Sequence, residues 1–378
     1  MCAENDDSRM PNQMQISNAV NGVDVTPPGG VVLRRSQGHA SPGDGDVHPL
    51  VSIIVVSHNR AADLRDTLAS IGRCEIPGNL PTEILAVDNA STDGTAEELN
   101  NARFENMAYR PITEPRKGKC RGLNRAIREG RGSVLIFTDD DVRVPGDWVQ
   151  RMAEPILAGK ADGVCGGARP AGHLVRHSMS KTEKGLMVSS EFTPDSELAN
   201  PMLIGVNMAC RRSAMETLGG FDEEIGPGTP YAACEDVLFS LQFKQAGFKI
   251  VPAMDVVVEH HFDPARMTRA GFLARPRLEG IASAYIRYHW QHEAIALPRL
   301  RLMKHYLRLF VAKAMNLDRS GGETVPDWEI DRIRDIEFYK QYMKERRRGH
   351  LYPHLGLRKH GAWPLLDGTP RMAASGSK

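Results

Sequence analysis

The chain has 378 residues, 41% of them hydrophobic, and its 48 basic and 47 acidic residues leave a formal net charge of only +1. This length and composition suit one large domain or two ordinary ones with a sizeable core. The balanced charge argues against nucleic acid or a strongly cationic protein as a partner. The six cysteines form no C-x-x-C pair, which argues against a zinc site and against a disulfide framework.

Residues 1–48 are rich in Asn, Asp, Gly, Pro and Ser, and runs such as Pro27 to Gly30 interrupt any periodicity. This composition predicts a disordered leader. The N-terminus carries Glu4, Asp6 and Asp7 instead of a basic flank and an apolar core, so no signal peptide is readable. No apolar run approaches the roughly 20 residues that cross a bilayer. The sequence therefore predicts a soluble, cytoplasmic protein.

Strands and helices alternate from residue 50 onward. Continuous β-branched or apolar runs predict strands at 51–56, 83–88 and 133–138, and helical spacing predicts helices at 61–71, 95–101 and 122–129. This alternation predicts an α/β fold with a mainly parallel sheet and helices on both of its faces. In such sheets, ligands bind beyond the carboxyl ends of the strands.

Polar residues follow the first two predicted strands. The first ends in Ser57, His58, Asn59 and Arg60, and the second ends in Asp88. A carboxylate at the tip of a buried strand can accept hydrogen bonds from a nucleobase or a ribose hydroxyl. Alternatively, Ser91 or Thr92 caps the helix that follows.

The segment from Arg116 to Asn124 brings four cations and two glycines together before a helix. Glycine allows close approach of the backbone, and a helix N-terminus favours negative charge, so the segment suits an anionic diphosphate. A solvated basic turn is the alternative.

Three carboxylates, Asp139, Asp140 and Asp141, stand directly behind the third strand. Alternation along a strand puts Asp139 and Asp141 on one face and Asp140 on the other. Two carboxylates on one face suit a hard divalent cation, Mn2+ or Mg2+, that also binds phosphate oxygens. The alternative is an acidic turn before a helix that opens at Pro145 or Asp147.

Taken in order, these segments resemble glycosyltransferase family 2. The likeness covers roughly residues 50–265 and continues through the segments 205–212, 219–223, 226–230 and 235–236. The ordered set is more specific than any one motif. The resemblance implies a GT-A fold over 49–265, with a Rossmann-like nucleotide-sugar-binding half at 49–145 and an acceptor half at 146–265. It also implies a nucleotide-sugar donor, most often a UDP-sugar, a divalent cation, and inversion at the anomeric carbon.

The resemblance also implies individual roles. The predicted donor-binding residues are Ser57, Asn59 and Asp88 at the nucleoside, Lys117, Arg121 and Asn124 at the diphosphate, and Asp139 at the ribose. Asp141 would bind the metal. Asp236 would be the base that takes the proton of the acceptor hydroxyl, and Glu235 beside it would order the acceptor or raise the pKa of the base. The alternative is a purely structural role, in which both carboxylates stabilise the N-terminus of a helix.

Glu259, His260 and His261 end a short strand predicted at 256–258, after another at 249–252. A neutral imidazole here can complete a metal shell, a role that family relatives give to a histidine at this position. We favour His260 over His261 as the ligand. The alternative for either histidine is an ordinary surface residue.

The sequence departs from the family at two positions. Cys234 stands where relatives commonly have glycine, and Gln242 stands where they have arginine, so the acceptor side is expected to differ. The Gln-x-x-Arg-Trp signature of processive synthases is absent, which favours transfer of a single sugar.

Residues 266–345 are predicted to form a helical extension, and 346–378 a loosely ordered tail. Within the extension, Leu300, Met303, Leu307 and Phe310 recur at helical spacing among several cations. The helix at 299–314 would either lie on an anionic membrane as a peripheral contact or pack its apolar side on the catalytic domain. The second placement is favoured.

The sequence as a whole predicts an inverting, metal-dependent glycosyltransferase of polysaccharide biosynthesis. Its acceptor would be a glycan, a lipid-linked intermediate or a small molecule. A nucleotidyltransferase, and a non-catalytic glycan- or nucleotide-binding module on the same fold, are the alternatives.

Overall fold

The computed structural model describes residues 49–176, 180–187, 200–315 and 325–361. The predicted leader, residues 1–48, lies outside these ranges. The sheet has eight strands in the order β3-β2-β1-β4-β7-β6-β8-β5. The strands are β1 (Val51–Ser57), β2 (Thr82–Asp88), β3 (Ala108–Thr113), β4 (Val134–Thr138), β5 (Val142–Arg143), β6 (Gly163–Pro170), β7 (Asn207–Arg211) and β8 (Ile250–His260).

Strands β3, β2, β1 and β4 are parallel to one another, and β6 is parallel to β8. Strand β7 runs antiparallel between β4 and β6, and β5 runs antiparallel to β8 at the edge. The prediction of a mainly parallel sheet is confirmed. Every residue of β1 is buried, which explains why its sequence is a continuous apolar run without alternation.

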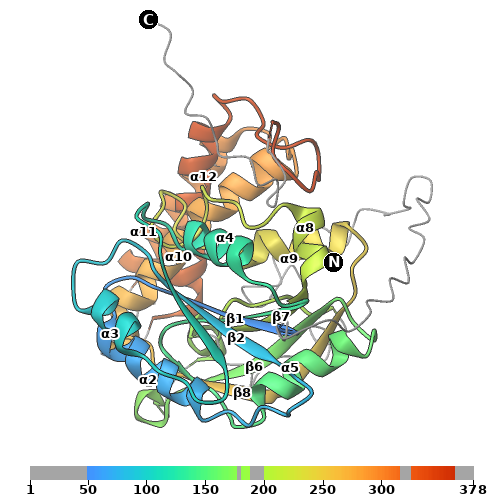
Figure 1. Ribbon diagram of the computed structural model, residues 1–378. Coiled ribbons are helices and arrows are strands. Elements are labelled where there is room, and N and C mark those ends of the chain that lie inside the picture. The colour runs from blue at the N-terminus through green and yellow to red at the C-terminus, as the bar shows by residue number, and fades with distance from the viewer. Residues whose placement is uncertain (1–48, 177–179, 188–199, 316–324, 362–378) are drawn as a thin grey trace, which may run out of the picture.

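Helices cover both faces of the sheet (Figure 1). On one face, α2 (Ala61–Gly72), α3 (Thr95–Asn101) and α5 (Trp148–Leu157) form one hydrophobic core with the sheet, which includes Ile53 and Val55 of β1. On the other face, α4 (Lys119–Glu129), α8 (Arg212–Leu218) and α9 (Glu235–Gln245) form a second core, which includes Ile54 and Val56. The sheet thus separates two hydrophobic cores. Because β1 is parallel to β2 and β4, the carboxyl ends of these three strands lie at the same edge of the sheet.

Two details of the sheet differ from the sequence prediction. The predicted strands at 249–252 and 256–258 are one strand, β8, and its pairing with β6 shifts register between Gly166 and Gly167. Strands β3, β5, β6 and β7 were not predicted. Strand β3 lies at the edge of the sheet with only Ile112 buried, so it has no strong apolar pattern to read.

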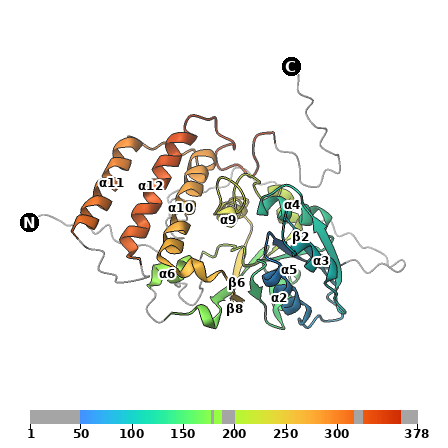
Figure 2. The same cartoon turned by 90° about the vertical axis from the view of Figure 1, so that its left-hand side faces the viewer.

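The helical extension is confirmed. Short turns at Gly172–Leu174 and Pro264–Met267 and the helix α6 (Lys181–Leu186) lead to α10 (Arg269–Tyr285), which continues as a π-helical turn, Ile286–Trp290. Helix α12 (Asp327–Glu345) packs on α10, and α11 (Pro298–Ala314) packs on α12. Figure 2 shows these three helices side by side, with α11 outermost. The domain boundaries at residues 49, 145, 265 and 345 stay predictions.

The favoured placement of the helix at 299–314 was wrong. Its apolar residues Leu300, Met303, Leu307 and Phe310 are 59–70% exposed. The opposite side, which includes Leu302 and His305, is half-buried against α12. The helix thus joins the protein through this other side, where His305 also pairs with Asp335.

The predicted loose tail also differs from the structure as far as residue 361. The phenol of Tyr352 is buried and donates to Asp222 Oδ2 at 2.8 Å, and Lys359 pairs with Asp222 Oδ1 at 2.6 Å. The segment after α12 therefore returns to the catalytic part of the chain. Residues 362–378 lie outside the described ranges. No helix in those ranges is long and apolar enough to cross a membrane.

Candidate active site

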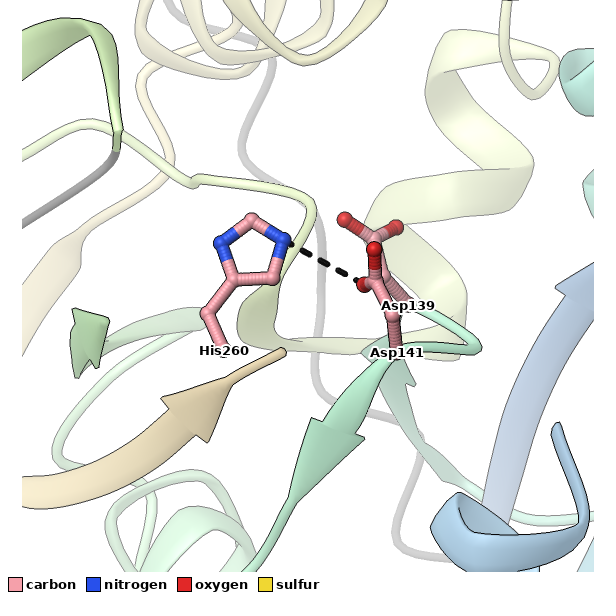
Figure 3. A group of neighbouring side chains, drawn as sticks. All are labelled: Asp139, Asp141 and His260. Atoms are coloured by element: carbon pink, nitrogen blue, oxygen red, sulfur yellow. Dashed lines mark ion pairs between the residues drawn. The ribbon is translucent and has the colours of Figure 1, made fainter. Parts of the chain in front are cut away.

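The site begins with three side chains from two elements. Asp139 and Asp141 follow β4, and His260 is the last residue of β8. One ligand atom from each lies within 4.8 Å of the others, and His260 Nε2 is 3.2 Å from Asp141 Oδ1 (Figure 3). The register of β5 with β8 brings them together, because Val142 pairs with His260.

This group fits a divalent cation. Asp141 Oδ1 is buried and, besides the His260 imidazole at 3.2 Å, has no hydrogen-bond partner in the part of the chain that the structure describes. Buried polar atoms normally have partners, so this oxygen is open to a bound cation. Two carboxylates and one imidazole form a donor set that suits Mn2+ or Mg2+. Burial would raise the pKa of Asp141, but the interactions with His260 and Arg60 lower it and keep the carboxylate charged.

Asp140 shares Arg60 with Asp141 and has Ser57 as its other partner. Its Oδ2 accepts a hydrogen bond from the Ser57 hydroxyl at 2.6 Å, and its Oδ1 lies 3.3 Å from Arg60 Nη1. Burial raises the pKa of Asp140 to about 7, against the opposing effect of Arg60. Strand β4 ends at Thr138, so the three aspartates form a turn. Asp139 and Asp141 nevertheless share one cluster while Asp140 lies apart from it.

A half-buried lysine joins this cluster to the next acidic pair. Lys119 Nζ is 2.6 Å from Asp139 Oδ1 and 3.3 Å from Glu235 Oε1. Burial would lower the pKa of Lys119, but Asp139 and Glu235 raise it well above its usual value. Burial raises the pKa of Glu235 above its usual value, although the charge of Lys119 acts to lower it. Lys119 therefore joins Asp139 and Glu235 in one ionic group.

Asp236 sits in the first turn of α9 and is held by two backbone amides. Val237 N donates to its Oδ1 at 2.8 Å, and Gly205 N donates to its Oδ2 at 3.1 Å. These two hydrogen bonds fix the position of the carboxylate. Asp236 is half-exposed, so its carboxylate can accept a proton from a group in solution.

The loops after β1 and β2 are tied to each other. Asn59 N donates to Ser91 Oγ at 3.0 Å, and Thr92 N donates to Asn59 Oδ1 at 2.7 Å. Asp88 Oδ1 accepts from Ser91 N at 3.0 Å. Neither Ser91 nor Thr92 caps α3, whose N-cap is Gly94, so that alternative was wrong. These bonds fix a shared rim at the strand ends where the nucleoside is predicted.

The basic segment differs in part from its predicted form, because α4 already begins at Lys119. Arg121 Nε lies 3.7 Å from Glu223. The Asn124 amide is fully engaged: it donates to Phe221 O and accepts from Phe221 N, both at 2.9 Å. Lys117 is exposed. The diphosphate roles of these three residues stay predictions, and Asn124 has a structural task besides.

Three residues of the site were not given roles by the sequence. Arg60 and Lys119 were visible only as cations within larger motifs, and their burial against carboxylates depends on tertiary packing. Asn89 accepts from Gly118 N at 2.8 Å and donates to Arg116 O at 2.9 Å, so it sets the shape of the basic segment. The one feature of the sequence that could have indicated a role for Asn89 is its position directly after Asp88, at the end of a strand.

The two departures from the family have local consequences. Cys234 has a positive φ of 63°, the left-handed region that favours the glycine of relatives. Gln242 donates to Leu357 O at 3.3 Å, which ties α9 to the segment after α12. Arg275 of α10 pairs with Glu279 at 3.1 Å. Burial would lower the pKa of Arg275, but the charge of Glu279, with smaller contributions from Asp236 and Glu235, raises it.

Comparison with known proteins gives a consistent result. Residues 52–219 match the family model described as Glycosyl transferase family 2. The chain is similar to glycosyltransferase AglE of Haloferax volcanii, with 26% identity over 220 residues that cover 58% of this chain and 68% of that protein. It is also similar to the O-antigen chain rhamnosyltransferase RfbN of Salmonella typhimurium, with 22% identity over 222 residues, 56% of this chain and 66% of that protein.

A solved structure shares the fold. The mannosyltransferase PcManGT from Pyrobaculum calidifontis, in complex with GDP-Man and Mn2+, superimposes with a TM-score of 0.55 at 18% identity, covering 88% of this chain and 92% of that one. The likeness extends beyond the catalytic part into the helical extension.

Proposed function

Residues 52–219 place this chain in glycosyl transferase family 2, and from that premise we propose that the protein moves one sugar from a nucleotide-sugar donor to an acceptor hydroxyl, with inversion. The observation that carries the proposal is the ionic group at the strand ends. Asp139, Asp141 and His260 form a cation-binding set, and Lys119 joins it to Glu235, next to Asp236. The groups proposed to bind the cation and the pair that contains the proposed base are therefore neighbours.

The donor side lies at the ends of β1, β2 and β4. Ser57, Asn59 and Asp88 line the nucleoside pocket, and Lys117, Arg121 and Asn124 stand on the diphosphate side. Asp139, Asp141 and His260 would hold the divalent cation, Mn2+ or Mg2+, which when bound neutralises charge on the leaving diphosphate. The Mn2+ and GDP-Man in the fold neighbour support this cation and this donor class. A UDP-sugar is the donor that the motifs favour, and a GDP-sugar is the nearest competitor.

The acceptor side lies at the start of α9. The acceptor oxygen attacks the anomeric carbon as the bond from that carbon to the diphosphate breaks, and the hydroxyl proton passes to Asp236. Two backbone amides position the Asp236 carboxylate, and a positioned carboxylate can act as a general base. Attack opposite the leaving group inverts the configuration. Glu235, paired with Lys119, orients the acceptor.

The acceptor is proposed to be a growing glycan, free or lipid-linked, of a polysaccharide. The rhamnosyltransferase of O-antigen chains among the relatives supports this class. A small-molecule acceptor is the alternative. The chain lacks the processive signature, so one sugar is transferred per encounter.

A donor screen tests the proposal. Binding of UDP-, GDP- and dTDP-sugars is measured by calorimetry with and without Mn2+, together with release of the nucleoside diphosphate. One preferred donor with Mn2+-dependent affinity is expected. Failure to bind any nucleotide sugar would refute the proposal. Release of pyrophosphate from a nucleoside triphosphate and a sugar phosphate would instead identify a nucleotidyltransferase.

A further inference from the structure

Helix α11 presents an uncovered apolar stripe along its length. Leu300, Met303, Leu307 and Phe310 are spaced at three and four residues, so they share one face of the helix, and they are 59–70% exposed. Four large side chains in one exposed row differ from the scattered apolar residues of an ordinary surface. Helix α11 lies outside α12 (Figure 2), and the stripe is on the side of α11 opposite the half-buried Leu302 and His305.

The charge around this stripe has one sign. Helix α11 contains Arg299, Arg301, Lys304, Arg308 and Lys313 and no Asp or Glu. Lys313 pairs with Glu329 of α12 at 3.2 Å, while the other four cations are exposed. Lys304 and Arg308, one turn apart, follow one edge of the stripe, and Arg299 lies at the other edge. An occupant of this surface must therefore be apolar at its centre and anionic at its border.

We propose that α11 docks the protein on an anionic lipid bilayer, with its apolar stripe among the acyl chains and its cations at the headgroups. A helix with an apolar face bordered by Lys and Arg has the chemistry of an interfacial helix. A second copy of the chain fits worse, because two such helices would bring like charges together and α11 offers no carboxylate to pair them. The inner side, fixed on α12 by His305 and Asp335, leaves the stripe free for this contact.

Sedimentation with lipid vesicles tests the proposal. The full chain is mixed with vesicles of phosphatidylcholine alone or of phosphatidylcholine with phosphatidylglycerol, and the bound fraction gives the partition coefficient. Binding is expected to the anionic vesicles and to weaken with added salt. Lys304→Gln with Arg308→Gln should lower the coefficient about 25-fold, since each cation near the surface contributes about five-fold. Leu307→Ser with Phe310→Ser should lower it about ten-fold or more.

The matched control is Leu157→Ser with Lys160→Gln, an exposed apolar residue and an exposed cation at the end of α5, which should leave binding unchanged. All three double variants alter exposed side chains, so their melting temperatures should match that of the parent protein. The proposal is overturned if the chain binds neither vesicle, or if both α11 variants bind like the control. It is also overturned if sedimentation velocity without lipid shows a dimer that Leu307→Ser with Phe310→Ser dissociates.

Discussion

Replacing Asp236 by asparagine separates donor binding from chemistry. The carboxylate accepts one hydrogen bond at each oxygen, from Val237 N at 2.8 Å and Gly205 N at 3.1 Å. Asparagine keeps the shape but offers one acceptor oxygen, so one of these amides will face an NH2 group. Losing one charge-assisted hydrogen bond should cost about 1.5–3 kcal/mol of folding free energy.

The effect on transfer should be larger and of a different kind. Asparagine cannot take the proton of the acceptor hydroxyl, so the transfer rate should fall about 10²-fold or more, which corresponds to about 2.7 kcal/mol in the barrier. Donor affinity should stay nearly unchanged, since Asp236 is not one of the three cation-binding side chains. Single-turnover transfer and calorimetric titration of the donor measure the two quantities separately.

Glu235→Gln is the matched comparison. It removes the 3.3 Å pair with Lys119 and leaves Asp236 in place, so it should disturb stability and acceptor binding more than the chemical step. A near-parental transfer rate in Asp236→Asn would show that the base lies elsewhere. A collapse of donor affinity together with the rate would place Asp236 in the donor or cation shell instead.

Three other substitutions test the site and the scaffold. Asp141→Asn should weaken Mn2+-dependent donor binding about 10²-fold, measured by calorimetry with and without Mn2+, because it removes a charged ligand from the cation set. Gly166→Ala should lower the free energy of unfolding by about 2–4 kcal/mol in urea titrations, since its Cβ would stand 2.1 Å from Asn207 Nδ2, which bridges β6 and β8. Glu345→Gln should make the free energy of unfolding fall less between pH 4.5 and pH 2, measured by acid denaturation. Burial alone would raise the pKa of Glu345, but hydrogen bonds, the largest from His289, lower it to about 2. Its charge therefore stabilises the fold above pH 4.5, and that contribution is lost as the pH falls toward 2.

Each of these substitutions has its control. Asp140→Asn, whose partners are Ser57 and Arg60, should spare metal-dependent binding, and equal damage at 140 and 141 would contradict the cation assignment. Gly172→Ala meets no atom within 4 Å and should be neutral, so an equal loss there would refute the packing argument. Glu337→Gln on the same helix should keep the parental acid denaturation curve. An unchanged curve in Glu345→Gln would rule out the proposed linkage.

The sequence alone determined strands β1, β2 and β4, the helices that follow β1 and β2, and the edge of the sheet at which the site lies. The buried runs of β1, β2 and β4 are continuous and apolar because helices cover both of their faces, and this property is visible in the residues themselves. The polar residues that follow these strands meet because parallel strands end at one edge. The order of these local signals sufficed to predict the family.

Only the tertiary structure decided which side chains meet within that edge and which faces stay bare. Lys119 and Glu235 are separated by more than a hundred residues, and their pairing depends on how α4 and α9 pack on the sheet. The spacing of Leu307 and Phe310 defines a face of α11, but whether that face is covered depends on where α12 docks. Periodicity and turn chemistry act between near neighbours and can be read from the chain, whereas contacts between distant elements are fixed by the packing of all of them together.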